Sequence, residues 1–204
     1  MKLLHVDSSI LGAHSISRQL TAEIVAKLRQ ATPGLEITYR DLAAEPVPHL
    51  TGVLIAARQP GAQQPSADVD QDLLLGAKVL HEFLAADIVV VGAPMYNFGV
   101  PSQLKAWIDN LAVSGKTFRY IATGVVGLAG GKRMIIASSR GGFYAGSSPV
   151  ASLDHQEAYL SGFFGFLGVT DIAFVRAEGV NVSPEQRQRG LDSALAEVAA
   201  IKAA

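Results

Sequence analysis

Short runs of aliphatic and β-branched residues alternate along this chain with longer segments of helical periodicity. Residues 87–92 (DIVVVG) form a nearly continuous apolar run, which is typical of a central strand buried on both faces of a parallel sheet. Similar short runs predict four further strands, at residues 2–7, 35–41, 132–137 and 171–175. This alternation favours an α/β fold over an all-helical or all-strand one.

The segments between these strands carry helical patterns. Helices are predicted over residues 15–31, 51–58, 68–85, 101–113, 154–167 and 183–203, and the Gly-rich residues 116–131 are predicted to form a small hairpin. Right-handed crossovers then place helices on both faces of the sheet. We expect one domain over residues 1–204. Its five strands should follow the flavodoxin-like order 2-1-3-4-5, with a ligand at the carboxyl ends of strands 1, 3 and 4.

Charge and cysteine content exclude several classes of function. The formal net charge is −1, which gives no sign of a nucleic-acid or anionic membrane partner. The chain has no cysteine, so disulfides, thiolate metal sites and thiol redox chemistry are excluded, and any redox function requires a bound cofactor. Neither a membrane-spanning stretch nor a signal peptide is recognisable, so a cytoplasmic location is expected.

Four serines lie in the ten residues that follow the first predicted strand. A helix N-terminus offers unpaired N–H groups and a positive dipole end, which together with hydroxyl groups can bind a phosphate. We assign this role to Ser9, Ser15, Ile16 and Ser17, with Ile16 and Ser17 acting partly through their N–H groups. The alternative is simple N-capping, which Ser15 alone would satisfy. The loop by itself does not decide between the two.

Residues 93–101 (APMYNFGVP) follow the third predicted strand. A planar cofactor ring needs flat apolar walls and a few polar groups for its edge. Met95 and Phe98 can supply the walls, and the Asn97 amide can bond a ring heteroatom. The alternative is a structural turn whose aromatic residues belong to the core. Core packing alone does not explain an amide between two aromatic residues.

Residues 138–144 (SSRGGFY) follow the fourth predicted strand. Two adjacent glycines, Gly141 and Gly142, allow a close backbone approach and leave N–H groups free to donate. Such donors can stabilise negative charge on a reduced ring. The alternative is a flexible turn, but the position at the end of a strand favours a ligand site.

Other well-known motifs are absent or incomplete. No G-x-G-x-x-G occurs, and residues 115–117 (GKT) lack the first P-loop glycine because Asn110 stands in its place. His81-Glu82 begins like a zinc-protease helix, but Ala85 occupies the position of the second histidine, so no metal site is expected. No G-x-S-x-G nucleophile elbow is present.

The three loops taken together resemble the FMN-dependent NADH-azoreductases, within the wider group of flavodoxin-like NAD(P)H:quinone oxidoreductases. The matching motifs are Ser8-Ser9, Ser15-Ile16-Ser17, Ala93-Pro94-Met95-Tyr96-Asn97-Phe98 and Ser139-Arg140-Gly141-Gly142. Residues 103–105, 117–120 and 163–168 are also similar, so the resemblance extends over nearly the whole chain. The third and fourth of these motifs, at their observed spacing, are its most specific part, whereas the serine motifs alone are not specific.

The resemblance implies a homodimer with its active sites at the subunit interface and with non-covalently bound FMN. NADH or NADPH would reduce FMN, and a quinone or an azo compound would then be reduced in the same place by two-electron, ping-pong hydride transfer. By this resemblance, FMN binding falls on Ser9, Ser15, Ile16, Ser17, Met95, Tyr96, Asn97, Phe98, Ser139, Arg140, Gly141 and Gly142. Phe98, Tyr120 and Phe163 would form the substrate pocket, the last two from either subunit.

A catalytic role is expected for Asn97 and Gly141, which would hold the ring edge, and Tyr120 is the best candidate for a proton donor. Trp107 is expected either in the core or, as we favour, at a subunit interface. The alternative functions are a flavodoxin-like electron carrier and a non-catalytic flavin-binding protein. Electron carriers of this fold are usually strongly acidic, and the near-neutral charge argues against that alternative.

Overall fold

The central sheet is parallel and five-stranded, with the spatial order β2-β1-β3-β6-β7. This computed structural model describes residues 1–59 and 61–202. The sheet strands are β1 (Lys2–Asp7), β2 (Glu36–Asp41), β3 (Ile88–Pro94), β6 (Arg133–Ser139) and β7 (Asp171–Ala177). Numbered within the sheet alone, they follow the order 2-1-3-4-5, so the predicted topology is confirmed.

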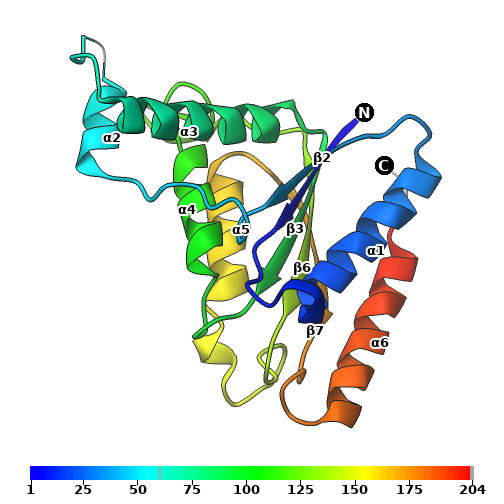
Figure 1. Cartoon of the computed structure of the whole chain (residues 1–204). Helices are drawn as coiled ribbons and strands as arrows, with labels where there is room; N and C mark the ends of the chain where they lie inside the picture. Colours follow the sequence, from blue (N-terminus) through cyan, green and yellow to red (C-terminus); the bar gives the residue numbers. More distant parts are fainter. Residues whose placement is uncertain (60, 203–204) are drawn as a thin grey trace.

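Helices cover both faces of this sheet (Figure 1). Helices α1 (Ile16–Ala31) and α6 (Pro184–Ala200) lie on one face. Helices α3 (Ala67–Ala85), α4 (Ser102–Leu111) and α5 (Gln156–Phe166) lie on the other. The short helix α2 (Gly52–Ala57) projects beyond α3. Among the described residues, no helix is long and apolar enough to span a membrane.

Each central strand contributes to two hydrophobic cores. In β3, Val89 and Val91 pack with α3, α4 and α5, whereas Ile88 and Val90 pack with α1 and α6. All four are buried, which explains why this strand is an unbroken apolar run in the sequence. Trp107 is fully buried in the first core, with ring centroids 6.1 Å from Phe83 and 6.3 Å from Phe164. Our preference for an interface position of Trp107 was therefore wrong.

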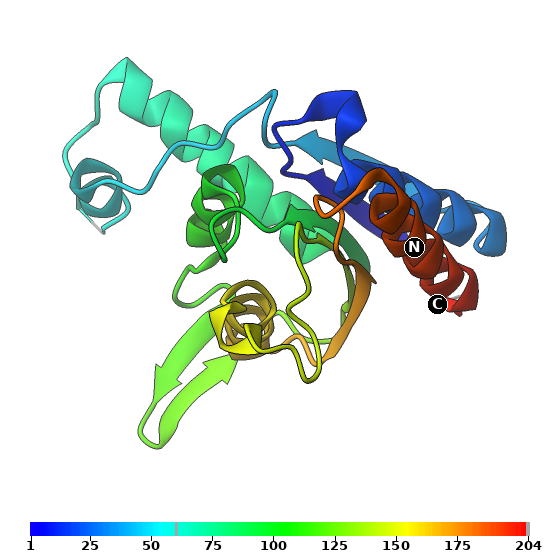
Figure 2. The same cartoon turned by 90° about the horizontal axis from the view of Figure 1, so that it is seen from below.

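The Gly-rich segment after α4 forms the predicted hairpin. Strands β4 (Phe118–Ile121) and β5 (Gly124–Gly127) pair antiparallel in a sheet of their own. Figure 2 shows this hairpin extending away from the main sheet, beside α5. The phenol ring of Tyr120 is largely exposed there, with 73% of its residue surface accessible.

Strands β3 and β6 are longer than their hydrophobic patterns predict. Ala93 pairs with Ser138, and Pro94 pairs with Ser139, so residues that we assigned to loops belong to the sheet. A hydrophobic pattern cannot detect such a strand end, because Ser138 and Ser139 are buried polar residues. The loops that leave the sheet therefore begin at Met95 and Arg140 rather than at Ala93 and Ser138.

Several helix ends also differ from their predicted positions. Helix α4 begins after Pro101, and α5 begins at Gln156, where the Asp154 carboxylate accepts the N–H groups of Gln156 (3.0 Å) and Glu157 (3.2 Å). Short 3-10 turns, Gly12–His14 and Ala151–Leu153, were not predicted. The last helix, α6, runs from Pro184 to Ala200, so it ends before the predicted Ala203, a residue that itself lies outside the described part of the chain.

Candidate functional site

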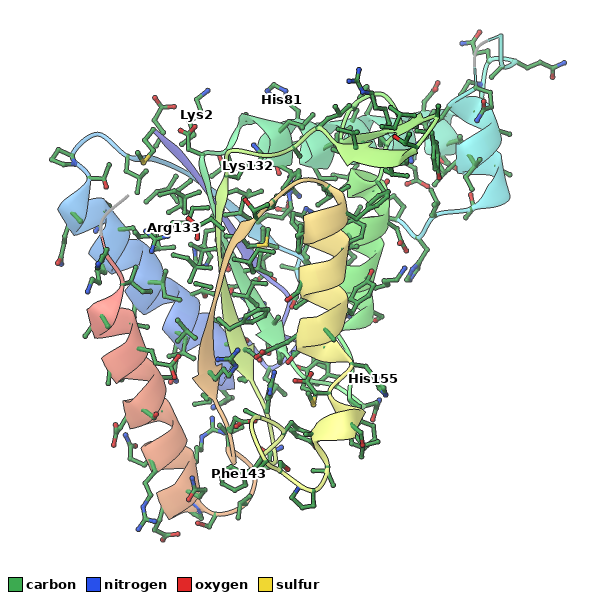
Figure 3. All side chains as sticks on the ribbon, turned by 180° about the vertical axis from the view of Figure 1, so that it is seen from behind. Lys2, His81, Lys132, Arg133, Phe143 and His155 are labelled. Atoms are coloured by element: carbon green, nitrogen blue, oxygen red, sulfur yellow. The ribbon has the colours of Figure 1, made fainter. Side chains whose placement is uncertain are left out.

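The loops after β1, β3 and β6 meet at the carboxyl end of the sheet, because these three strands are neighbours. Figure 3 shows Phe143 and His155 at this end of the molecule. Lys2, Lys132 and Arg133 lie at the opposite end. The predicted convergence of the three loops is therefore what the fold produces, and it brings most of the predicted site residues together.

The loop after β1, residues 8–17, is called the serine loop. It provides both an N-terminal cap for α1 and a set of buried hydroxyl groups. Ser15 caps α1 by accepting the N–H of Arg18 at 3.3 Å, and its Oγ also lies 3.0 Å from the Oγ of Ser17. Ser9, Ser15 and Ser17 are all buried. Ile16 and Ser17 stand in the first turn, where N–H groups have no partner inside the helix. Capping thus accounts for one serine and leaves further donors at the same helix end.

The serine loop is clamped from behind by Arg18, a residue that the sequence analysis did not single out. Its Nε and Nη2 donate to the carbonyl of Ser9 at 3.2 and 2.8 Å. Its two Nη atoms also donate to the Asp41 carboxylate, each at 2.6 Å. These charge-assisted bonds from Arg18, with the N–H groups of Ala43 and Ala44, hold the pKa of Asp41 below its ordinary value.

Removal of the Arg18–Asp41 ion pair should lower the free energy of unfolding by an amount that depends on pH. A lowered folded-state pKa means that the contribution to stability is present above the ordinary Asp pKa of 3.8 and is lost as pH falls through the lower folded value. We expect Asp41→Asn to reduce the free energy of unfolding by about 1–2 kcal/mol at pH 7. Urea titrations of both proteins at pH 7 and near pH 3 should show this difference shrinking in acid. A difference that is independent of pH would contradict the assignment.

The turn after β3 has an uncommon backbone. Asn97 and Phe98 adopt left-handed conformations, with φ of 49° and 69°, and Tyr96 and Gly99 exchange backbone hydrogen bonds of 3.1 and 3.0 Å around them. Residues other than glycine rarely occupy this region, and those that do cluster at functional sites. The Tyr96 hydroxyl also lies 3.3 Å from the Oγ of Ser9, so this turn touches the serine loop.

In the turn after β6, the N–H groups of the two glycines are available to a ligand, whereas the arginine side chain is buried. The N–H groups of Gly141 and Gly142 donate to no acceptor within the described part of the chain. The Arg140 side chain is 0% exposed and faces Asp154, Glu157 and Glu178. Arg140 also uses its N–H and carbonyl groups in backbone bonds to Ala177 and Val180. The structure thus places Arg140 behind the turn, where no polar group of this residue is open to a ligand.

A cavity of about 750 Å³ lies beside the turn after β3, which runs from Tyr96 to Gly99 and is called the Tyr96 turn. Its lining includes Ile10 from the serine loop, Asn97 and Val100 from the turn, Lys105 from α4 and Tyr159 from α5. Burial, reinforced by the nearby Asp109 carboxylate, raises the pKa of Tyr159 to about 12, so its phenol is neutral at pH 7. This volume and mixed lining suit a planar aromatic molecule.

None of the three predicted pocket residues lines this cavity within its own chain. Phe98 is exposed, and its ring centroid lies 6.2 Å from that of Tyr144. Tyr120 is on the exposed hairpin, and Phe163 packs from α5 against the core, 5.2 Å from the ring of Phe164. Over residues 1–59 and 61–202, no cluster of three or more metal-ligating side chains occurs.

Comparison with known proteins places these features in a family. A family model described as the flavodoxin-like fold matches residues 1–201. A Bradyrhizobium diazoefficiens protein named FMN-dependent NADH:quinone oxidoreductase 2 is 56% identical over 204 residues, which cover 100% of both chains. A Rhizobium meliloti protein named FMN-dependent NADH:quinone oxidoreductase is 58% identical over 188 residues, which cover 92% of this chain and 90% of the relative.

Solved structures agree with these relatives. An azoreductase from Bacillus anthracis superposes with a TM-score of 0.88 at 30% identity, covering 98% of this chain and 97% of that one. An FMN-dependent NADH-azoreductase from the Ames Ancestor strain of the same species, in complex with FMN, also has a TM-score of 0.88. Its identity is 27%, with 97% of this chain and 95% of that one covered.

Proposed function

Because this chain belongs to the protein family with the flavodoxin-like fold, we propose that it is an FMN-dependent NADH:quinone oxidoreductase. One observation carries the proposal: the serine loop, the left-handed turn at Asn97 and the Gly141–Gly142 turn share the carboxyl edge of adjacent strands. Parallel α/β sheets bind ligands at this edge. The names of relatives that match from end to end support the same activity here.

The N-terminus of α1 suits the FMN phosphate. The hydroxyls of Ser9, Ser15 and Ser17 would donate to its oxygens, as would the N–H groups of Ile16 and Ser17. The dipole of α1 favours a dianion at this end. The nearby guanidinium of Arg18 is already bonded to Asp41 and the Ser9 carbonyl, so its role is to hold the loop.

The flavin ring would lie between the turns that follow β3 and β6. The residues we assign to it are Met95, Tyr96, Asn97, Phe98, Ser139, Gly141 and Gly142. The Met95 N–H already donates to the Ser139 carbonyl at 2.8 Å, which ties the two strand ends together and leaves the Met95 side chain as a wall. The N–H groups of Gly141 and Gly142, which have no acceptor among the described residues, and the Asn97 amide fit the polar edge of such a ring.

When bound, FMN would supply the two-electron redox chemistry between NADH and the second substrate. The chain supplies orientation and electrostatics. The N–H groups of Gly141 and Gly142 would stabilise negative charge on the ring edge, since preorganised donors act most strongly in a site that excludes water. The apolar side chains of Ile10 and Val100 would keep water from the ring.

A second copy of the chain completes the proposed site. Tyr120 and Phe163 do not line the cavity of their own chain, yet the family resemblance assigns both to the substrate pocket. We therefore propose a homodimer in which each hairpin brings Tyr120 to the other subunit's site, where its phenol is the candidate proton donor. Residues 1–204 would then form one FMN-binding domain per subunit. The expected cytoplasmic location stays a prediction.

We propose quinones as the main substrates and aromatic azo compounds as further ones. Quinone reduction is the activity in the names of relatives above 50% identity, whereas the azoreductases are near 30%. Because NADH and the acceptor would occupy one shared site in turn, the reaction should follow ping-pong kinetics. Steady-state rates with NADH and a benzoquinone should give parallel double-reciprocal lines, and intersecting lines would contradict one shared site. An azo dye in place of the quinone tests the second substrate class.

Ser17→Ala should weaken FMN binding about tenfold, or about 1.4 kcal/mol, without weakening riboflavin binding. The variant removes one hydroxyl near the phosphate but keeps a good helix former in the first turn of α1. Fluorescence quenching of each flavin by the flavin-free protein measures both affinities. Ser183→Ala is the control for loss of a serine hydroxyl at a helix N-terminus outside the proposed site, because Ser183 caps α6. If riboflavin binding fell as much as FMN binding, the phosphate would not lie at Ser17.

A further inference from the structure

A buried ion cluster lies directly behind the Gly141–Gly142 turn. The fully buried guanidinium of Arg140 faces three carboxylates, at 2.9 Å from Asp154 Oδ2, at 3.2 Å from Glu178 Oε1 and in contact with Glu157. A buried cation of this kind requires such partners, because desolvation of an unpaired charge is costly. The cluster is therefore a fixed element of the fold rather than a surface ion pair.

A chain of hydrogen bonds leads from the cluster to the end of β3. Arg140 Nε donates to Ser138 Oγ at 3.0 Å, and Ser138 Oγ donates to Gln156 Oε1 at 2.9 Å. Gln156 Nε2 then donates to the Ala93 carbonyl at 2.8 Å. Three hydrogen bonds in series, through the buried side chains of Ser138 and Gln156, therefore connect the cluster to the strand end that precedes the Tyr96 turn.

The cluster also holds the glycine turn itself. Glu178 Oε1 accepts the N–H groups of Tyr144 at 2.7 Å and Ala145 at 3.0 Å. The carbonyls of Gly141 and Gly142 accept N–H groups from the segment after β7, at 3.1 and 2.9 Å. Both carbonyls are thus fixed toward the protein, whereas the two glycine N–H groups keep no acceptor within the described residues.

We propose that Arg140 and Glu178 are positioning residues, which hold the N–H groups of Gly141 and Gly142 ready for the electron-rich edge of the reduced FMN ring. This inference rests on the proposed function. A turn that is fixed before the ligand arrives loses little conformational freedom on binding, and its donors need no reorganisation when charge develops. Disturbing these positioning residues should therefore weaken the binding of reduced FMN more than that of oxidised FMN.

Glu178 is the residue to test, because removing Arg140 would take the shared buried cation away from three carboxylates and could unfold the protein. We expect Glu178→Ala to weaken binding of oxidised FMN about threefold and of reduced FMN about 30-fold. The tenfold difference corresponds to a midpoint potential about 30 mV lower than that of the wild-type protein. Glu178→Gln keeps an oxygen that can accept both N–H groups, so it should restore the wild-type affinities and potential.

The experiment is a spectroelectrochemical titration of the FMN-loaded wild-type, Glu178→Ala and Glu178→Gln proteins, with FMN affinity measured on the flavin-free forms. Glu197→Ala is the matched control, since Glu197 accepts the N–H of Arg176 at 3.1 Å and bonds nothing in the glycine turn. Equal potentials for the Ala and Gln variants would overturn the proposal, because the effect would then follow charge rather than position. An unchanged Glu178→Ala protein would also overturn it. A wild-type protein that takes up no FMN would instead overturn the proposed function.

Discussion

Replacing Gly142 with valine is expected to weaken FMN binding about 100-fold, or about 2.7 kcal/mol, without unfolding the protein. The atoms nearest to a Cβ at Gly142 belong to the Tyr144 side chain, at 3.4 Å or more, which is ordinary van der Waals contact. The protein's own packing therefore does not require glycine at this position. In our account the missing side chain leaves room for the flavin ring, and valine would occupy that room.

The measurement is FMN affinity by fluorescence quenching, together with the thermal midpoint of the flavin-free protein. The midpoint of Gly142→Val should stay within a few degrees of the wild-type value. FMN affinity that is unchanged in a folded variant would place the ring elsewhere. Gly142→Ala should have a smaller effect in the same direction, since one methyl group intrudes less than three carbons.

Gly127→Ala is expected to reduce the free energy of unfolding by about 3 kcal/mol, the upper part of the usual range for overpacking. A Cβ at Gly127 would lie 2.2 Å from the Gly168 nitrogen and 2.3 Å from the Leu167 carbonyl carbon. Both are backbone atoms at the end of α5, so neither can rotate away. The hairpin that carries Tyr120 would have to move from α5.

Urea unfolding of the flavin-free protein measures this change. Gly162→Ala is the matched control, because it lies within α5 and a Cβ there meets nothing within 4 Å. Alanine in a helix should stabilise that variant by about 0.5–1 kcal/mol relative to glycine. Equal stabilities of Gly127→Ala and the wild-type protein would mean that the hairpin does not rest on the α5 terminus.

The sheet order could be predicted because each central strand is apolar on both sides. Val89 and Ile88 face opposite cores, and both are hydrophobic, so the pattern of β3 alone indicates a parallel strand covered by two layers. The strand ends could not be predicted in the same way. Ser138 and Ser139 are buried by pairing with β3 and by the Arg140 cluster, and no hydrophobic signal marks such residues.

The candidate site was predictable to the extent that it lies in loops after particular strands. Ser9, Asn97 and Gly142 are predicted as site residues because their residue types are unusual at those positions, and their roles stay predictions. The residues that support them could not be identified. Arg18 and Glu178 act through contacts with segments more than twenty residues away, with Asp41 and Tyr144 respectively, and a single sequence carries no signal for such pairs. The burial of Arg140 could not be predicted for the same reason: its sequence position suggests a ligand contact, whereas its side chain lies in the interior.

An anaerobic titration tests the central claim most directly. Purified protein is loaded with FMN, freed of excess flavin, mixed with one equivalent of NADH, and then mixed with one equivalent of a benzoquinone, while flavin absorbance is recorded. Our account predicts that the absorbance of bound FMN disappears with NADH and returns fully with the quinone. Protein that retains no FMN, or bound FMN that NADH does not bleach, would contradict the assignment of this chain as an FMN-dependent NADH:quinone oxidoreductase.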